Sequence, residues 1–203
     1  MTVDEGVSLD ALPMPLRWVG QPAAWSVADG GLRIVAGART DWFVDPQGVA
    51  EPKLDAPVLL GPTSGDFMLS ARVTVEFAAT YDAGVLVVHA DDSHWAKLCF
   101  EYSPEQEPMV VSVVTRDVSD DCNSFVVDGD SVWLRIARLG PALAFHASLD
   151  GRRWSLVRHF ALGSPREPSV GFLAQSPTGD GCASTFGRIE YRPDRLEDLR
   201  SGV

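Results

Sequence analysis

The side chains best suited to binding chemistry lie on one face of a predicted strand over residues 95–101. Alternate side chains of a strand point to opposite faces, and one face of this strand is entirely apolar. The other face carries an aromatic ring and two opposite charges, from Trp95, Lys97 and Glu101. A saccharide or another polyol needs an apolar platform for its C–H groups and fixed partners for its hydroxyls. Trp95 is suited to the first role and the two charged residues to the second.

Polar residues of two other predicted strands extend this candidate binding face. Ser112 and Arg116 alternate with valines in the next strand, and Arg135 lies in a strand over residues 131–138. If these strands are neighbours of the first, their side chains converge on one ligand. The alternative is a solvent-exposed sheet face with cross-strand Lys–Glu and Arg–Glu pairs, each contributing roughly 0.2–1 kcal/mol.

Glu101 also permits a catalytic interpretation. Together with Asp41 or Glu105 it could form the pair of carboxylates that glycoside hydrolysis requires. In the sandwich glucanases, acidic residues alternate along one strand, whereas Cys99 and Ser103 flank Glu101 on its own face. We therefore expect non-catalytic binding and keep a glycoside hydrolase as an alternative.

The sequence gives little indication of a metal or cofactor site. The acidic stretch 117–130 offers oxygen ligands, but without the spacing of a calcium-binding loop, and is predicted to be a solvated loop. The histidines share no metal-ligand spacing; they are His89, His94, His146 and His159. Neither a metal nor a cofactor is expected.

Composition restricts the class of partner. A net charge of −11 over 203 residues argues against nucleic acid, because phosphate binding needs a basic face. The N-terminus lacks a secretory pattern, and no apolar run approaches the roughly 18–20 residues that span a bilayer. Three cysteines without clustered spacing predict neither a disulfide framework nor a zinc ribbon. We expect a cytoplasmic protein that binds no membrane, of undetermined oligomeric state.

The elements that must position these side chains are strands throughout. Roughly a dozen period-two segments, separated by Gly- and Pro-containing turns, predict an all-β sandwich or jelly roll of two antiparallel sheets. Residues 1–15 read as a loosely held lead-in, 16–193 as one domain and 194–203 as a tail. Helical character is expected only within 194–200.

Several motifs in a fixed order carry a family resemblance. They include Thr40-Asp41-Trp42, Tyr81-Asp82-Ala83-Gly84, Trp95-Ala96-Lys97 followed by Glu101, Val132-Trp133-Leu134-Arg135, Ser148-Leu149-Asp150-Gly151 and Ser176-Pro177. In this order the chain, over about residues 16–191, resembles the domain-of-unknown-function 1349 family, which includes the proteins called regulation of enolase protein 1. The resemblance implies a concanavalin A-like jelly roll, whose concave sheet binds sugars in many proteins of that superfamily.

The resemblance also shapes the expected site. It adds Asp41 and Trp42 to the predicted ligand-binding residues, and the family name suggests a regulatory protein-interaction module as an alternative function. The chain departs from the family pattern at two places. Trp42 precedes Phe43, where an aromatic residue usually precedes the Trp, and Asp121 stands where the family often has Trp.

Overall fold

The period-two segments form strands as predicted. The computed structural model describes residues 6–202, which contain sixteen strands and no helix. The strands are β1 (Arg17–Val19), β2 (Ala24–Ala28), β3 (Gly31–Val35), β4 (Trp42–Phe43), β5 (Lys53–Leu54), β6 (Val58–Pro62), β7 (Phe67–Glu76), β8 (Ala83–Asp91), β9 (His94–Tyr102), β10 (Pro108–Arg116), β11 (Val118–Val126), β12 (Ser131–Leu139), β13 (Ala142–Ser148), β14 (Ser155–Phe160), β15 (Ser169–Gln175) and β16 (Ala183–Arg192). Nowhere in residues 6–202 does the chain form a helix of the length and hydropathy needed to cross a bilayer.

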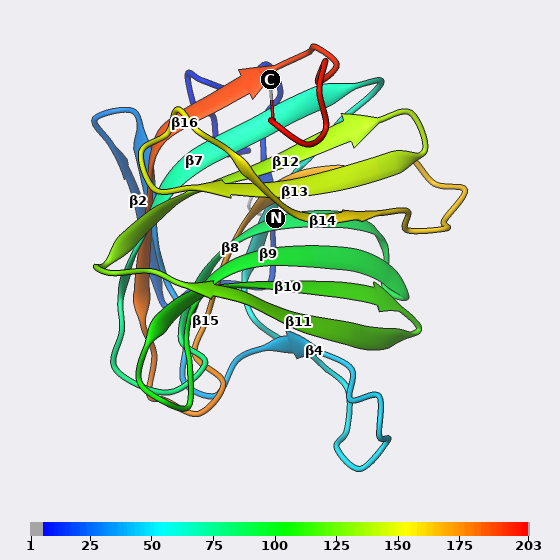
Figure 1. Ribbon diagram of the computed structural model, residues 1–203. Helices are drawn as coiled ribbons and strands as arrows, with labels where there is room; N and C mark the ends of the chain where they lie inside the picture. The colour runs from blue at the N-terminus through cyan, green and yellow to red at the C-terminus, as the bar shows by residue number, and fades with distance from the viewer. Residues whose placement is uncertain (1–5, 203) are drawn as a thin grey trace.

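Two seven-stranded antiparallel sheets pack face to face (Figure 1). Sheet I has the strand order β1-β6-β15-β8-β9-β10-β11, and sheet II has the order β14-β13-β12-β7-β16-β3-β2. The short β4–β5 pair lies outside both sheets. In Figure 1, β8 to β11 occupy the lower layer and β7, β12 and β13 the upper one. The predicted all-β jelly-roll sandwich is confirmed.

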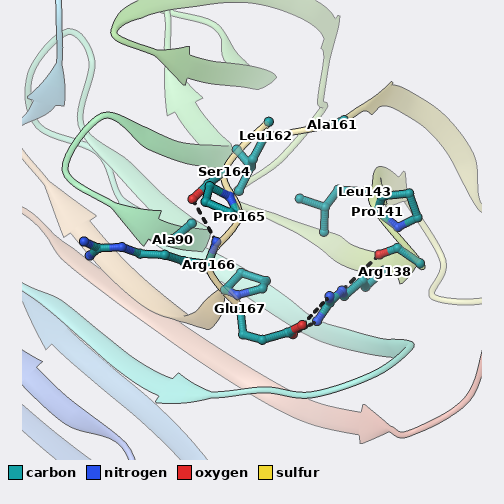
Figure 2. Close-up of a pocket in the computed structure, with 13 residues that line it drawn as sticks. Ala90, Arg138, Pro141, Leu143, Ala161, Leu162, Ser164, Pro165, Arg166 and Glu167 are labelled. Atoms are coloured by element: carbon teal, nitrogen blue, oxygen red, sulfur yellow. Dashed lines mark hydrogen bonds and ion pairs between the residues drawn. The ribbon is translucent and has the colours of Figure 1, made fainter.

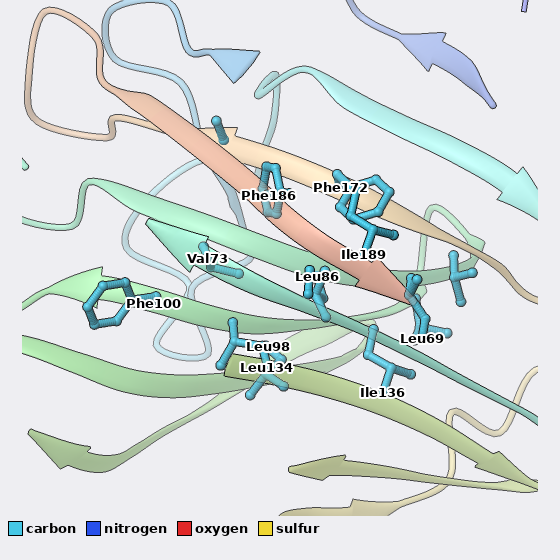
Figure 3. Packing of buried hydrophobic residues seen from close by; sticks show 14 of the residues in the cluster. Leu69, Val73, Leu86, Leu98, Phe100, Leu134, Ile136, Phe172, Phe186 and Ile189 are labelled. Atoms are coloured by element: carbon cyan, nitrogen blue, oxygen red, sulfur yellow. The ribbon is translucent and has the colours of Figure 1, made fainter. Parts of the chain in front are cut away.

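The hydrophobic core fills the space between the sheets. Ala96, Leu98 and Phe100 of β9 are fully buried on the inner side of sheet I, and Leu134 and Ile136 of β12 are fully buried on the inner side of sheet II (Figure 3). Burying one large apolar side chain stabilises a fold by about 1.5–3 kcal/mol. The apolar row of β9 therefore fixes which way that strand faces, and its polar row must point outward.

The acidic stretch predicted to be a loop forms strand β11 instead. This strand lies at the end of sheet I and pairs only with β10. Because an edge strand is open to solvent on one side, it tolerates charged side chains, and these also discourage pairing with other chains. A strand with carboxylates at this position is therefore compatible with the polar pattern that suggested a loop.

The described parts of both predicted terminal segments, 1–15 and 194–203, pack against the sandwich. Val7 and Leu16 exchange two backbone hydrogen bonds of 2.8 Å, and the side chains of Val7 and Leu9 are buried in the core. The tail forms turns and bends rather than the expected helix, and Leu196 packs on the outer side of sheet II with Met68. Residues 1–5 and 203 of these segments lie outside the described residues.

Candidate functional site

The polar row of β9 faces outward from sheet I, as the alternation predicts. Lys97 lies opposite Val87 of β8 and Val113 of β10, so the lysine has an apolar neighbour on each side. Glu101 lies four residues further along the same row, beyond Cys99, and next to Met109 of β10. Around β9, the outer face of sheet I is therefore an apolar surface that Lys97 and Glu101 interrupt.

Residues 40–56, the cover segment, cross part of this face. Trp42 is buried there, donates a hydrogen bond from Nε1 to the Ala56 carbonyl oxygen at 3.0 Å, and packs edge-on against Trp95 with 5.5 Å between ring centroids. The backbone of Val44 exchanges hydrogen bonds with Ser119 of β11. Because Trp95 is fully buried beneath this segment, it cannot serve as the predicted platform for a sugar ring.

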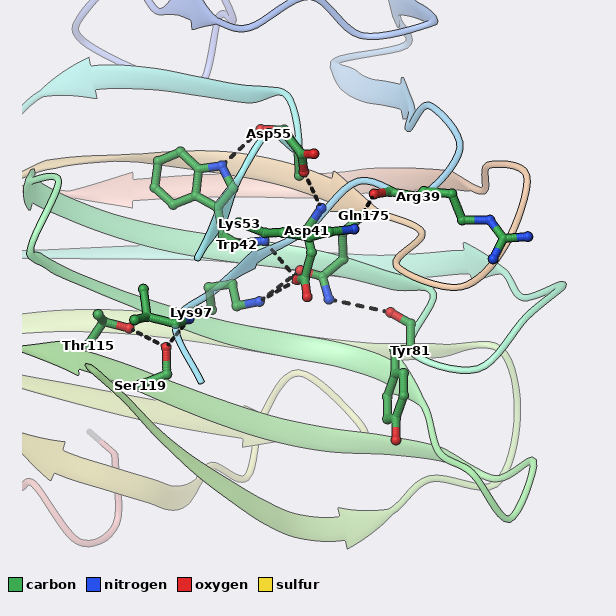
Figure 4. Close-up of polar contacts among 12 residues, drawn as sticks. Arg39, Asp41, Trp42, Lys53, Asp55, Tyr81, Lys97, Thr115, Ser119 and Gln175 are labelled. Carbon is green, nitrogen blue, oxygen red and sulfur yellow. Dashed lines mark hydrogen bonds and ion pairs between the residues drawn. The ribbon is translucent and has the colours of Figure 1, made fainter. Parts of the chain in front are cut away.

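Lys97 is held by two acceptors although only 2% of it is exposed. Its Nζ donates to Oε1 of Gln175 at 2.8 Å and to Oδ1 of Asp41 at 3.3 Å (Figure 4). Burial is the largest single influence on the pKa of Lys97 and acts to lower it, but the surrounding acidic groups, Asp41 first among them, together outweigh burial, and the net pKa lies above the usual value. The lysine is therefore a fixed cation at neutral pH, with a defined direction for its donors.

Glu101 has the opposite electrostatic situation. Burial raises the pKa of its carboxyl to about 8, and the nearby charges of Asp121 and Asp41 act in the same direction while Lys97 opposes them. Burial likewise raises the pKa of Asp121. Among residues 6–202, no side chain donates a hydrogen bond to the Glu101 carboxyl. At neutral pH Glu101 is mostly a neutral acid that can both donate and accept a hydrogen bond.

These side chains line a single open pocket of about 400 Å³, here called the Lys97 pocket. Its polar lining consists of Asp41, Lys97, Glu101, Ser103, Asp121, Asn123 and Gln175. Its apolar lining consists of Phe43, Tyr81, Pro104, Met109 and Val113. Hydrogen-bonding groups and aromatic rings thus face the same space.

The structure brings together Asp41, Lys97 and Glu101 as predicted, and adds residues that the sequence did not single out. Gln175 reaches the pocket because β15 pairs with β8, which places its side chain beside the β9 row. Asp121 comes from the edge strand β11, opposite Val113. In the sequence, the only indication that Asp121 belongs to the site is its departure from the family pattern, in which a Trp often occupies this position.

Five of the eight predicted site residues do not line the pocket: Trp42 and Trp95 are buried beside it, and Ser112, Arg116 and Arg135 lie elsewhere. Ser112 is opposite Leu98 and therefore points between the sheets, where its side chain is within 3.5 Å of Arg158 Nη1. Arg116 ends β10 on an exposed position and donates to the carbonyl oxygen of Ala161. The prediction that Ser112 and Arg116 share a face with Lys97 is wrong, because Val111 and Val113 occupy that face.

Arg135 is also absent from the pocket. It belongs to β12, which lies in sheet II between β13 and β7, and no residue of β12 pairs with sheet I. Arg135 could reach the same ligand as Lys97 and Glu101 only if the strand over residues 131–138 were a neighbour of β9 in one sheet. The jelly-roll connection instead moves the chain to the opposite sheet after β11.

The described residues offer no cluster typical of a metal site. Within residues 6–202, no three His, Cys, Asp or Glu side chains come together as potential ligands of one ion. Cys99 lies in the Lys97 row, but it is fully buried, and burial raises the pKa of its thiol well above the usual value. It therefore acts as a small packing residue rather than a nucleophile.

Comparison with known proteins decides the family. A model of the family described as proteins of unknown function, DUF1349, matches residues 18–194. The chain belongs to the DUF1349 family. No curated protein sequence matches it. Among solved structures, the DUF1349 chain is similar to a functionally unknown protein from Saccharomyces cerevisiae, with a TM-score of 0.80 and 24% identity over 87% of this chain and 95% of that one.

Larger enzymes share the fold of this DUF1349 protein. The GH43 protein BlXynB from Bacillus licheniformis matches with a TM-score of 0.70 and 15% identity, over 88% of this chain and 37% of the enzyme. A GH43B protein associated with xyloglucan in Bacteroides ovatus matches with a TM-score of 0.69 and 17% identity, over 87% of this chain and 36% of that protein. The chain thus spans little more than a third of either protein, and at these identities the similarity shows the fold alone.

Proposed function

We propose that this DUF1349 protein binds a neutral polyhydroxylated ligand, a saccharide or a related polyol, in the Lys97 pocket. One observation supports this proposal. Lys97, whose Nζ is fixed by Gln175 and Asp41, lines the same 400 Å³ space as Phe43 and Tyr81. Pockets of about 300–1,000 Å³ with a few converging polar groups are typical of small-molecule sites. The rings take over the platform role that the buried Trp95 cannot perform.

The charges of the pocket favour a neutral ligand. Lys97 is the one cationic side chain among the described residues that line it, and Asp41 already pairs with that charge at 3.3 Å. Glu101 and Asp121 add acidic groups whose pKa values are raised because their surroundings disfavour negative charge. A phosphate or carboxylate ligand would therefore meet repulsion, whereas hydroxyl groups can both donate to and accept from these side chains.

The test compares matched glutamate variants on a glycan array, with affinities measured by titration calorimetry. Glu101→Ala removes a donor and an acceptor from the pocket, and we expect it to weaken ligand binding on the order of tenfold. Glu105→Ala makes the same chemical change at an exposed residue that does not line the pocket, and should leave affinity unchanged. Absence of any bound glycan or polyol, or equal loss in both variants, would contradict the proposal.

A glycoside hydrolase is the second candidate. The observation that favours it is a protonated acid, Glu101 with a pKa of about 8, in one pocket with the carboxylates of Asp41 and Asp121. Glycosidases pair a general acid of raised pKa with a second carboxylate. The solved GH43 neighbours named above share the fold but not the length of this chain. Wild-type protein that releases reducing sugar, together with Glu101→Gln that binds the same glycan without turnover, would establish this alternative over simple binding.

The regulatory interaction module stays a prediction. An exposed apolar patch beside the pocket would favour it. Of the exposed large apolar residues, Tyr81 lines the Lys97 pocket, whereas Val19, Trp25 and Val27 belong to β1 and β2, and neither of these strands supplies a residue to it.

A further inference from the structure

Two arginines of the same strand, β12, differ sharply in how their charge is balanced. Arg138 forms a two-pronged ion pair with Glu167, through both terminal nitrogens, and its Nε donates to the Gly140 carbonyl oxygen (Figure 2). Arg135 lies on the outer side of sheet II and is only 7% exposed, yet no carboxylate among residues 6–202 pairs with it. A buried charge is ordinarily paired or fully hydrogen-bonded, so Arg135 calls for a separate explanation.

The guanidinium of Arg135 is held in place without being neutralised. One terminal nitrogen donates to the Gly202 carbonyl oxygen, and the group lies 4.1 Å from the centre of the Trp154 ring. Its Nε is buried and has no hydrogen-bond partner. Burial and the positive charge of Arg192 lower the pKa of Arg135 to about 10, while Glu190 acts weakly in the other direction. Stacking on an aromatic ring fixes the plane of a guanidinium and leaves the nitrogens at its edge free to donate hydrogen bonds.

Arg135 lines a surface pocket of about 630 Å³, here called the Arg135 pocket. Its lining residues are Met68, Arg135, Arg152, Trp154, Arg192, Asp194, Arg195, Glu197 and Gly202. Four arginines therefore face two carboxylates, in a protein whose net charge is −11. The exposed Arg192 and Arg195 pair with Asp194 at 3.5 Å and with Asp66 at 3.1 Å, respectively. Arg152 has no ion-pair partner among the described residues.

We propose that the Arg135 pocket binds a phosphate group, either as the free ion or as part of a small phosphorylated metabolite. Guanidinium groups recognise phosphate oxygens through paired, charge-assisted hydrogen bonds. The guanidinium of Arg135, fixed against Trp154, lies at one side of the pocket, and the exposed Arg152 and Arg192 supply further donors around it. The site is separate from the Lys97 pocket, which lies on the other sheet and carries the opposite balance of charge.

The test is a titration with inorganic phosphate at constant ionic strength, with chloride as the reference salt. Because Trp154 contacts Arg135, binding should produce a saturable change in tryptophan fluorescence that Trp154→Phe removes. Arg152→Gln and Arg192→Gln alter exposed side chains and should each weaken phosphate binding on the order of tenfold. Arg166→Gln removes the same charge from an exposed residue outside the pocket, and the affinity of this variant for inorganic phosphate should stay within about twofold of wild type.

A sugar phosphate provides the second arm and separates the two sources of the phosphate group. Tighter binding than inorganic phosphate assigns the site to a phosphorylated metabolite, and equal binding assigns it to the free ion. Arg135→Lys keeps the charge but removes the planar fork, and should weaken both ligands. If neither ligand gives a saturable change in the wild-type protein, or if Arg166→Gln loses as much affinity as Arg192→Gln, the pocket is not a phosphate site.

Discussion

Lys97 and Gln175 are 78 positions apart in the chain, yet the lysine Nζ donates a hydrogen bond of 2.8 Å to the glutamine Oε1. The contact exists because β8 pairs with β9 on one side and with β15 on the other. It joins the outward-facing side chains of β9 and β15 across the intervening strand β8. A buried cation is thereby satisfied by an uncharged acceptor on one side and by Asp41 on the other.

We expect Gln175→Ala to destabilise the fold because it removes one of the two acceptors of the buried Lys97. Leaving a buried polar group unsatisfied costs about 1–3 kcal/mol, which corresponds to a decrease of roughly 2–12 °C in Tm for a chain of this size. Urea denaturation measures the free energy of unfolding. Gln47→Ala, at an exposed position, is the control. Equal stability of the two variants would mean that Asp41 alone satisfies the lysine.

The stability of the protein should depend on pH through Glu101. Its pKa is about 8 in the folded state, against 4.5 in an unperturbed glutamate, so between these values the folded state binds more protons than the unfolded one. The contribution of the Glu101 carboxyl to the free energy of unfolding is therefore fully present below pH 4.5. It is lost progressively as the pH rises to about 8, because the unfolded chain then releases a proton that the folded protein retains. Glu101→Gln abolishes the titration. The difference in unfolding free energy between variant and wild type should grow from pH 5 to pH 8, and a constant difference would refute the assignment.

Gly84→Ala should destabilise the core. A Cβ at this residue of β8 would lie 2.6 Å from Val73 Cγ1 and 3.0 Å from Val75 Cγ2, both on the facing sheet. Overpacking of this kind costs about 1–3 kcal/mol. Gly187→Ala is the matched control, because a Cβ there would meet no atom within 4 Å. Thermal denaturation of the two variants distinguishes a packing effect from a general effect of glycine in a strand, and equal losses would argue against the former.

Calcium should not stabilise the protein. Neighbouring carboxylates of β11 point to opposite faces, so Asp121 lines the Lys97 pocket while Asp120 pairs with Arg158 Nη2 at 2.8 Å. They do not converge on one ion. Addition of chelator or of calcium should leave Tm unchanged, as measured by differential scanning calorimetry. An increase of several degrees with calcium would show binding to the folded state.

Local sequence pattern predicted the direction of β9 but not that of β10. In β9 one row is apolar and the other carries Lys97 and Glu101, so only one orientation buries the apolar row. In β10 both rows contain valines, and both are in fact buried, one in the core and one on the outer face of sheet I. Hydrophobicity therefore could not decide which face received Ser112.

Long-range pairing accounts for the remaining differences between the predicted and observed site. The side chain of Arg135 alternates correctly along β12, but alternation does not reveal which sheet a strand joins. Likewise, no periodic signal in residues 40–56 indicates that they cover Trp95. The placement of Gln175 depends on a pairing between strands that are distant in sequence. Each of these features is a property of topology rather than of local pattern.

The cover segment has a consequence for how such a binding site can change over time. Asp41 and Phe43, which line the Lys97 pocket, stand on residues 40–56 and not on the seven strands of sheet I. Surface connections of this kind accept insertions and deletions more readily than sheet strands do. Changes in this one stretch would remodel a wall of the pocket without altering the core between the two sheets. Because Asp41 also pairs with the buried Lys97 and Trp42 also covers Trp95, the positions of the segment that can vary at low cost to stability are those outside these two contacts.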